Sequence, residues 1–492
     1  MTHNRLGFRA DIEGLRAIAI VLVVAAHAKL PGFQGGFVGV DVFFVLSGYL
    51  ITALLVSEMS ETGRLDLMGF YARRFRRLLP GLLTMLLVSC LLASLLLSPN
   101  QQMAQAEAAA SAALWISNFH FAFSRLDYFS AGAESSLFLH TWSLGVEEQF
   151  YLVWPILLVL TLGLWQGKLA VVRRLPWLRV VMTLVIMVSL TACVCLTRTQ
   201  PAQAFYMMPT RAWQFGLGAL TWLCLRQSNE SRWAAKLPVL GWLGLTMIVG
   251  VAMLYSTDLP YPGLRAMVPS LGAALVIASG AGATQHGHGP ARLLSTRLFQ
   301  AFGKISYSWY LWHWPILLLG AAWFGYVSLG YRLGLVAISL ILALLSYRLV
   351  ESPIRQRASL VARPSFSVVV AVLTMLMAST LCLRWQDMAS DPLRHPEQVR
   401  ISSAHVDSPV IYGMGCDDWY HSAEVKPCHF GAEQAQHTAV LIGDSIGAQW
   451  FPAINRTFDR PGWQLLVITK SACAMVDKPQ FYVRIGREYV EC

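Results

Sequence analysis

Eleven stretches of mostly apolar residues constrain the fold of this chain more than any other feature. A helix needs about 20 such residues to cross the hydrocarbon core of a bilayer. Of the 492 residues, 55% are apolar and only 13% are charged. This charged fraction is about half of that in a typical soluble protein. The sequence therefore excludes a soluble enzyme and predicts an all-α polytopic membrane protein with about 11 transmembrane helices. The expected spans are 15–31, 37–57, 79–98, 144–164, 178–197, 209–225, 237–255, 265–281, 305–324, 333–350 and 365–384.

Loop charges predict the orientation of these spans. Alternate loops hold 22 Lys and Arg residues, whereas the opposite loops hold about five. Since positive loops stay in the cytoplasm, we expect a cytoplasmic N-terminus, and eleven crossings then place the C-terminal tail outside. The basic clusters lie in short loops between apolar spans, so we expect the lipid bilayer, and no nucleic acid, as a partner.

The tail differs in composition and predicts a second domain. Residues 1–384 carry a net charge of +15, and residues 385–492 carry −4. Within the tail, the run from His437 to Ser445 reads as a buried strand that ends in a tight turn, and Trp463 to Thr469 reads as the next strand. A helix-like segment between them suggests a β-α-β unit. We therefore expect a transmembrane domain over 1–384, a linker over 385–410 and an incomplete extracytoplasmic α/β domain over 411–492.

Cysteine positions agree with this division. Five cysteines lie in or beside the expected spans, where thiols pack as small apolar groups. The other four lie in the tail, which would face an oxidising compartment. Four cysteines allow three pairings, and we favour the disulfides Cys416–Cys428 and Cys473–Cys492. No cysteine spacing resembles a zinc site, so we expect no metal.

Ionisable residues inside spans are costly and are candidates for function. Arg16 and His27 lie eleven residues apart in the first span, so on a helix they share one face and are separated by about 16.5 Å along the axis. This arrangement predicts an anion-binding group at the cytoplasmic mouth and an acid or base deep in the same cavity. The alternative makes Arg16 a topology anchor and His27 an interfacial histidine.

The next polar groups lie around the second and third spans. Asp41 and Ser47 interrupt an apolar run, and Ser47 with Gly48 also suits small-residue helix packing. Four arginines then lie within five residues on the cytoplasmic side. Such a cluster is typical of positive loops, but beside Arg16 it would also suit the phosphates of a nucleotide-like donor. The arginines taken as donor-binding candidates are Arg16, Arg73, Arg74 and Arg77.

Two further clusters accompany later spans. His140 and Trp142 precede Glu147 and Glu148, and one of these glutamates would line the cavity while the other faces the headgroups. A carboxylate near His27 would raise its basicity for general-base catalysis. His313 lies in an aromatic run over 306–315, which is either part of the cavity or an interfacial belt.

Gly443-Asp444-Ser445 follows the first predicted strand of the tail. A strand-end turn exposes a serine at the start of a helix, which is the geometry of a hydrolase nucleophile. Alone, the tripeptide fits an ordinary turn equally well.

Taken together, these motifs resemble the acyltransferase-3 superfamily over residues of about 8–384. The subgroup it resembles most carries an SGNH-type domain outside the membrane and O-acetylates envelope glycans such as O-antigen, lipopolysaccharide or peptidoglycan. The resemblance implies a bacterial plasma (inner) membrane location and acetyl-CoA as a cytoplasmic co-substrate held by the arginines. It also implies that His27 and Glu147 act as acid and base and that Ser445 is a nucleophile. The motifs that carry it are Phe8-Arg-Ala-Asp-Ile-Glu-Gly-Leu-Arg-Ala17, Phe43-Phe-Val-Leu-Ser-Gly-Tyr49, the arginine cluster, Trp142 to Tyr151, and Tyr307 to Pro315.

Two departures from that family pattern concern the tail. Ile446 follows Ser445 where the family usually has histidine or leucine, and no histidine follows His437. We therefore expect this second domain to lack its general base and the sequence to be a fragment. The alternative function is a multi-pass transporter or flippase with an extracytoplasmic binding domain, although the internal repeats typical of transporters are not evident. A catalytically dead scaffold is a third alternative.

Overall fold

The computed structural model describes residues 8–124, 128, 136–163, 168–226, 237–282, 289–325, 328–391, 400, 403–404, 407–432, 434–476, 478, 480–482, 485 and 487–492. The chain divides into two compact units, Met1–Asp391 and Pro392–Cys492. The last helix of the first unit continues to Ser390, beyond the predicted domain end at residue 384. Part of the predicted linker, 392–399, lies outside the described residues.

Every predicted span coincides with a helix in the first unit. Long apolar segments fold as helices because a helix satisfies every backbone donor and acceptor within the segment. These helices are α1 Ala10–His27, α2 Gly39–Thr62, α3 Leu67–Leu96, α6 Trp142–Leu162, α7 Lys168–Thr199, α9 Met208–Leu225, α10 Leu237–Leu254, α11 Met267–Gly282, α14 Ser306–Phe324, α15 Leu329–Ser346 and α18 Pro364–Ser390.

Seven helical segments among the described residues are long and apolar enough to cross a membrane. Helix α10 is apolar but shorter, and α1, α9 and α14 are not among the seven. α1 carries three charged residues within its 18, Asp11, Glu13 and Arg16. Polar side chains inside a membrane protein pair with one another in its interior. Helices α1, α9 and α14, which are more polar than the seven, supply such buried side chains. The predicted count of eleven crossings stays a prediction.

Shorter helical segments connect the long ones. In the first unit they are η1 Gln34–Val38, α4 Pro99–Ala113, α5 Ser117–Phe123, η3 Leu139–Thr141, α8 Pro201–Tyr206, η4 Gly263–Ala266, α12 Pro290–Leu294, α13 Arg297–Lys304, η5 Tyr347–Glu351, α16 Ser352–Gln356 and α17 Ala358–Ala362.

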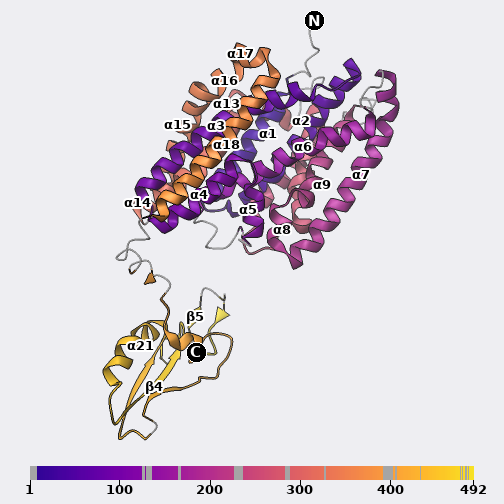
Figure 1. Cartoon of the computed structure of the whole chain (residues 1–492). Helices are drawn as coiled ribbons and strands as arrows, with labels where there is room; N and C mark the ends of the chain where they lie inside the picture. Colours follow the sequence, from indigo (N-terminus) through magenta and orange to yellow (C-terminus); the bar gives the residue numbers. More distant parts are fainter. Residues whose placement is uncertain are drawn as a thin grey trace. The chain divides into compact units, whose positions relative to one another are not determined.

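Helices distant in sequence pack side by side in this unit. α18 lies along α3 and α4 (Figure 1). α2 crosses α9 closely, because a Cβ added at Gly48 would lie 2.0 Å from the carbonyl oxygen of Phe215, and one at Gly218 would lie 2.0 Å from that of Val45. Small residues therefore allow the two backbones to touch, as the packing interpretation of Gly48 expects.

The second unit contains the predicted β-α-β arrangement around a small sheet. Strand β4 (Trp463–Lys470) is central and pairs in parallel with β3 (His437–Gly443) along its whole length. On its other side β4 pairs in parallel with β1 (Asp417–Asp418) and antiparallel with β2 (Cys428–Gly431). Helix α21 (Ser445–Phe458) packs on β3 and β4. The remaining elements are α20 Val410–Gly413, β5 Phe481–Tyr482 and β6 Arg487–Glu488.

Two disulfides close loops of this unit. They join Cys416 to Cys428 and Cys473 to Cys492, the two favoured pairs. Each is expected to stabilise the fold by about 3 kcal/mol in the chain-entropy model.

We expect thiol labelling of the unfolded chain to report these disulfides directly. Without reductant, denatured protein should take up five maleimides, because five of the nine cysteines are free. Reduction before labelling should raise this number to nine, measured by intact-protein mass spectrometry. Nine labels without reductant would contradict the pairing.

Candidate functional site

Two cavities enter the helical unit from the end that carries Arg16. The wider one has a volume of about 800 Å³, and the narrower one has about 260 Å³. They adjoin each other, because Arg16, Leu50, Arg77 and Tyr307 line both. The wider cavity also has Arg9, Glu13, Lys304, Glu351 and Arg355 in its wall, whereas the narrower one is lined mainly by apolar side chains of α2.

The arginine cluster lies on helix α3 and not in a loop, because α3 begins at Leu67. Arg74 and Arg77 are three residues apart, so they lie on one face, and both line the narrower cavity. Arg76 points elsewhere and donates to the carbonyl of Leu360 at 3.0 Å. Arg73 is not among the residues lining either cavity and lies 3.8 Å from Glu58.

Glu147 and Glu148 lie on different sides of helix α6. Glu147 lines the narrower cavity and accepts hydrogen bonds from the hydroxyls of Ser47 and Tyr151. The Arg74 guanidinium stacks over the Tyr151 ring, 4.6 Å from its centroid. Glu148 lines a separate, largely apolar cavity between α3, α6 and α18. The structure thus brings Ser47 and Glu147 together with the arginine-lined cavity.

His27 lies at the other end of α1, hydrogen-bonded to a second histidine. Its Nδ1 is 2.8 Å from Nε2 of His313, and its Nε2 is 2.8 Å from the hydroxyl of Tyr128. Nδ1 of His313 lies 3.1 Å from the carbonyl oxygen of Trp309, which only accepts. With both rings neutral, His313 therefore donates to Trp309, His27 donates to His313, and Tyr128 donates to His27. This chain of bonds fixes one tautomer of His27.

The histidine pair and the narrower cavity are separated by a buried tyrosine. Tyr310 lines that cavity, and its hydroxyl lies 2.6 Å from Ser143 Oγ and 2.8 Å from the carbonyl oxygen of His140. Its ring centroid is 5.5 Å from that of His313. His27 lines a different cavity of about 300 Å³, together with Lys29 and Arg332. Arg16 and His27 therefore line separate cavities, at the two ends of α1, and not the single cavity that their shared helix face led us to expect.

Not all candidates point into this site. Asp41 is buried in an ion pair with Arg211 of α9, 3.1 Å apart, and also accepts from Gln214 and Tyr261. Trp142 packs over the Arg211 guanidinium at 5.6 Å. His140 is buried beside His313, with a centroid distance of 5.7 Å, and its Nε2 donates to Leu311. Asp41 and Trp142 thus belong to a buried cluster that holds α2, α6 and α9 together.

Several residues of this region were not among the candidates predicted from the sequence. Tyr128 lies in a long loop without periodicity, and Arg211 reads as an ordinary residue near the end of a span. Tyr310 and Tyr151 were inside recognised motifs but were not singled out. Within the described ranges, no group of three or more His, Cys, Asp or Glu side chains is placed to hold a metal ion.

In the second unit, Ser445 is the first residue of α21 and is separated from the end of β3 by Asp444 alone. Asp444 caps the helix by accepting from the backbone N–H of Ile446 at 2.9 Å. Among the described residues, no histidine is hydrogen-bonded to the Ser445 hydroxyl.

Two tyrosines of the second unit have raised pKa values. Burial raises the pKa of Tyr412, and Asp417 raises it further. Burial, with Glu491 adding to it, raises the pKa of Tyr489 to about 12.

Comparison with known families covers both units. A family model described as "Acyltransferase domain" matches residues 9–348. A second one, described as "SGNH domain (fused to AT3 domains)", matches residues 415–490.

Relatives with assigned names are similar over most of the chain. The peptidoglycan O-acetyltransferase OatA of Listeria monocytogenes is 31% identical over 363 residues, which are 70% of this chain and 56% of the relative. The O-acetyltransferase OatA of Staphylococcus aureus is 29% identical over 394 residues, 76% of this chain and 63% of the relative. The matches therefore span less than two thirds of these relatives. No solved structure matches this chain.

Proposed function

This chain belongs to the acyltransferase-3 family, and on that basis we propose that it moves an acetyl group from acetyl-CoA to hydroxyls of a cell-envelope glycan. We further propose that the donor enters from the cytoplasm and that the acceptor is peptidoglycan or a lipopolysaccharide O-antigen. The relatives whose printed names specify peptidoglycan favour the first of these acceptors.

The arginine-lined pair of cavities carries this proposal. Coenzyme A combines a phosphate-rich nucleotide with a narrow, less polar arm. The wider cavity offers Arg16, Arg77, Lys304 and Arg355 for phosphates, and guanidinium groups bind phosphate through paired charge-assisted hydrogen bonds. The guanidinium of Arg9 also lines this cavity but is already bonded to Asp11, Tyr49 and the carbonyl of Ile277. The narrower cavity, with its apolar wall of α2, suits the arm and leads toward Ser143 and Tyr310.

We assign the acid–base chemistry to His27 and Glu147. In the tautomer fixed by His313, Nε2 of His27 is an acceptor directed at a hydroxyl, which is what a general base requires. Glu147 accepts two hydroxyl hydrogen bonds at the cavity wall and would hold a polar group of the donor there. Ser445 would then receive the acetyl group outside the membrane as a nucleophile.

A transporter or flippase remains the competing function, and the fate of the donor separates the two. Purified protein in nanodiscs is incubated with acetyl-CoA carrying a labelled acetyl group, and free CoA thiol is measured. An acetyltransferase releases the thiol, whereas a transporter leaves acetyl-CoA intact. The absence of thiol release would contradict the proposal.

Arg77→Ala is expected to weaken the apparent affinity for acetyl-CoA about ten- to a hundredfold. Each charge-assisted contact with phosphate contributes about 1.5–3 kcal/mol, and Arg77 lines both cavities. Titrating acetyl-CoA against thiol release measures the effect. Arg64→Ala is the matched control, since Arg64 is an exposed arginine in the loop between α2 and α3 and lines neither cavity. Equal affinities for Arg77→Ala and wild type would contradict the donor assignment.

A reporter fused after residue 400 is expected to respond as an extracytoplasmic one. The reason is that alternate loops hold 22 basic residues, whereas the opposite loops hold about five, and loops rich in basic residues stay in the cytoplasm. Paired reporters that are active on opposite sides of the membrane measure this in cells, with a fusion within residues 60–66 as the cytoplasmic control. A cytoplasmic signal at residue 400 would contradict the orientation.

A further inference from the structure

One edge of the sheet in the second unit collects the ends of three strands. β1, β3 and β4 are mutually parallel, so their carboxyl ends meet at the same edge. Asp417 of β1 and Gly443 of β3 both lie opposite Thr469 of β4, one on each side. With neighbouring strands about 4.8 Å apart, the two backbones are separated by about 10 Å at this edge.

An aromatic segment leaves this edge directly after β1. Trp419, Tyr420 and His421 follow in sequence, and their rings pack on one another with centroid distances of 4.8 Å and 4.2 Å. Tyr482 packs beside Trp419 at 6.1 Å. Tyr420 is half-buried and His421 is exposed, so this aromatic platform, Trp419 to His421, presents ring surface to the surroundings.

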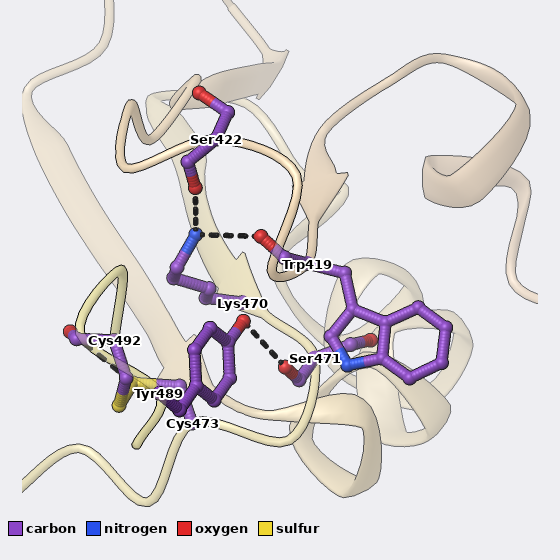
Figure 2. Close-up of a disulfide and its surroundings, with 7 residues drawn as sticks. All are labelled: Trp419, Ser422, Lys470, Ser471, Cys473, Tyr489 and Cys492. Atoms are coloured by element: carbon purple, nitrogen blue, oxygen red, sulfur yellow. Dashed lines mark hydrogen bonds between the residues drawn. A yellow bond between two sulfur atoms is a disulfide. The ribbon is translucent and has the colours of Figure 1, made fainter. Parts of the chain in front are cut away.

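The platform is held rigidly from two sides. The disulfide Cys416–Cys428 closes the loop that contains it. Beneath it, the buried Lys470 donates from Nζ to the carbonyl oxygens of Trp419 at 3.1 Å and Ser422 at 2.6 Å. Figure 2 shows this amino group between the two carbonyls, with the Trp419 side chain extending away from them. A surface segment fixed in this way loses little freedom when it binds a ligand.

A row of polar groups runs from the platform toward Ser445. Ser471, which follows β4, donates from Oγ to Asp417 at 2.6 Å. On the other side of β4, Gly443 lies opposite Thr469 and is followed by Asp444 and Ser445. The second carboxylate oxygen of Asp417 is buried and lacks a partner among the described residues. A hydroxyl donor reaching this edge would satisfy it.

We propose that this edge is a saccharide-binding surface on which a pyranose ring of the glycan acceptor stacks on the aromatic platform. The inference rests on the proposed function, which supplies the glycan. A pyranose has an apolar C–H face and a rim of hydroxyls, and rigid aromatic side chains with a few convergent polar groups match both. A ring on the platform leaves the next sugar of the same strand to cross the edge past Ser471, which follows β4, toward Ser445, which comes after β3.

Binding of a soluble oligosaccharide tests this saccharide-binding surface. The probe is a fluorescent β-1,4-linked N-acetylglucosamine tetramer, titrated against the full chain in nanodiscs and followed by fluorescence anisotropy. Tyr420→Ala is expected to weaken binding about tenfold or more, whereas Tyr420→Phe keeps the ring and should bind within about twofold of wild type. Trp450→Ala is the control, because it removes another exposed aromatic, on α21, that is not part of the platform.

Three results would overturn the proposal. They are the absence of binding by wild type, wild-type affinity for Tyr420→Ala, and an equal loss for Trp450→Ala. Release of CoA thiol by the wild-type chain, measured without glycan, tests the proposed function separately. Binding without thiol release would therefore contradict the proposed acetyltransferase function but not the saccharide-binding surface. Thiol release without binding would contradict the surface but not the function.

Discussion

Replacing His27 by alanine is expected to lower acetyl-CoA consumption and glycan acetylation together, by about a hundred- to ten-thousandfold, the usual contribution of a general base. The hydrogen-bond chain from Trp309 through His313 leaves Nε2 of His27 as an acceptor. Alanine removes that acceptor. The measurement is thiol release together with acetyl incorporation into glycan, with His120→Ala as a control, since His120 lies on the short helix α5 and outside this chain of bonds.

Where the second domain carries a general base for Ser445, Ser445→Ala is expected to separate the two activities. Ser445 belongs to the second unit, at the start of α21, so its loss should stop glycan acetylation but leave slow acetyl-CoA hydrolysis or an acylated intermediate. We therefore expect a relay in which acetyl passes the His27 site before it reaches Ser445. Normal glycan acetylation by Ser445→Ala would contradict the relay, and unchanged thiol release by His27→Ala would contradict the role of His27.

Replacing Asp41 by asparagine is expected to cost about 3–5 kcal/mol of unfolding free energy, because it leaves the charge of Arg211 buried without its partner. Arg211 is 1% exposed and Asp41 is 2% exposed. The carboxylate also accepts from Gln214 at 2.5 Å and from the Tyr261 hydroxyl. Few substitutions outside the cavities should destabilise the helical unit as strongly.

A paired substitution is the control for this effect. Asp41→Leu combined with Arg211→Met removes both charges, and buried ion pairs replaced by apolar residues are often as stable as before. Titration with a denaturing detergent measures unfolding of the purified protein in each case. A single substitution that costs less than about 1 kcal/mol, or a double one as costly as Asp41→Asn, would contradict a buried, energetically coupled pair.

Local structure was largely predictable, because apolar length alone indicates helices in a membrane protein. The largest differences are the starts of α3 and α7, which were expected at residues 79 and 178 and lie at Leu67 and Lys168. Hydropathy ends a predicted span at the first charged cluster, although arginine is a good helix former. The shift of α3 matters for the site, since the helix directs Arg74 and Arg77 to the cavity and turns Arg73 and Arg76 away from it.

Long-range pairing was not predictable from periodicity. His27 and His313 are 286 residues apart, and Asp41 and Arg211 are 170 apart. Nothing in their local sequence encodes either partner. In the second unit, β3 and β4 were predicted from apolar runs, whereas β1 and β2, with two and four residues, are too short to give a periodic signal. The edge that brings Trp419 toward Ser445 depends on β1 and was therefore missed.

The side from which acetyl-CoA is consumed tests the central claim most directly. Sealed vesicles are prepared with the protein in either orientation, and acetyl-CoA, which does not cross a bilayer because of its charge, is added outside. We predict thiol release only when the loop between α2 and α3 faces the added donor, because the arginine-lined cavities open at the Arg16 end of α1. Release from the opposite orientation alone, equal release from both, or none from either would contradict the account.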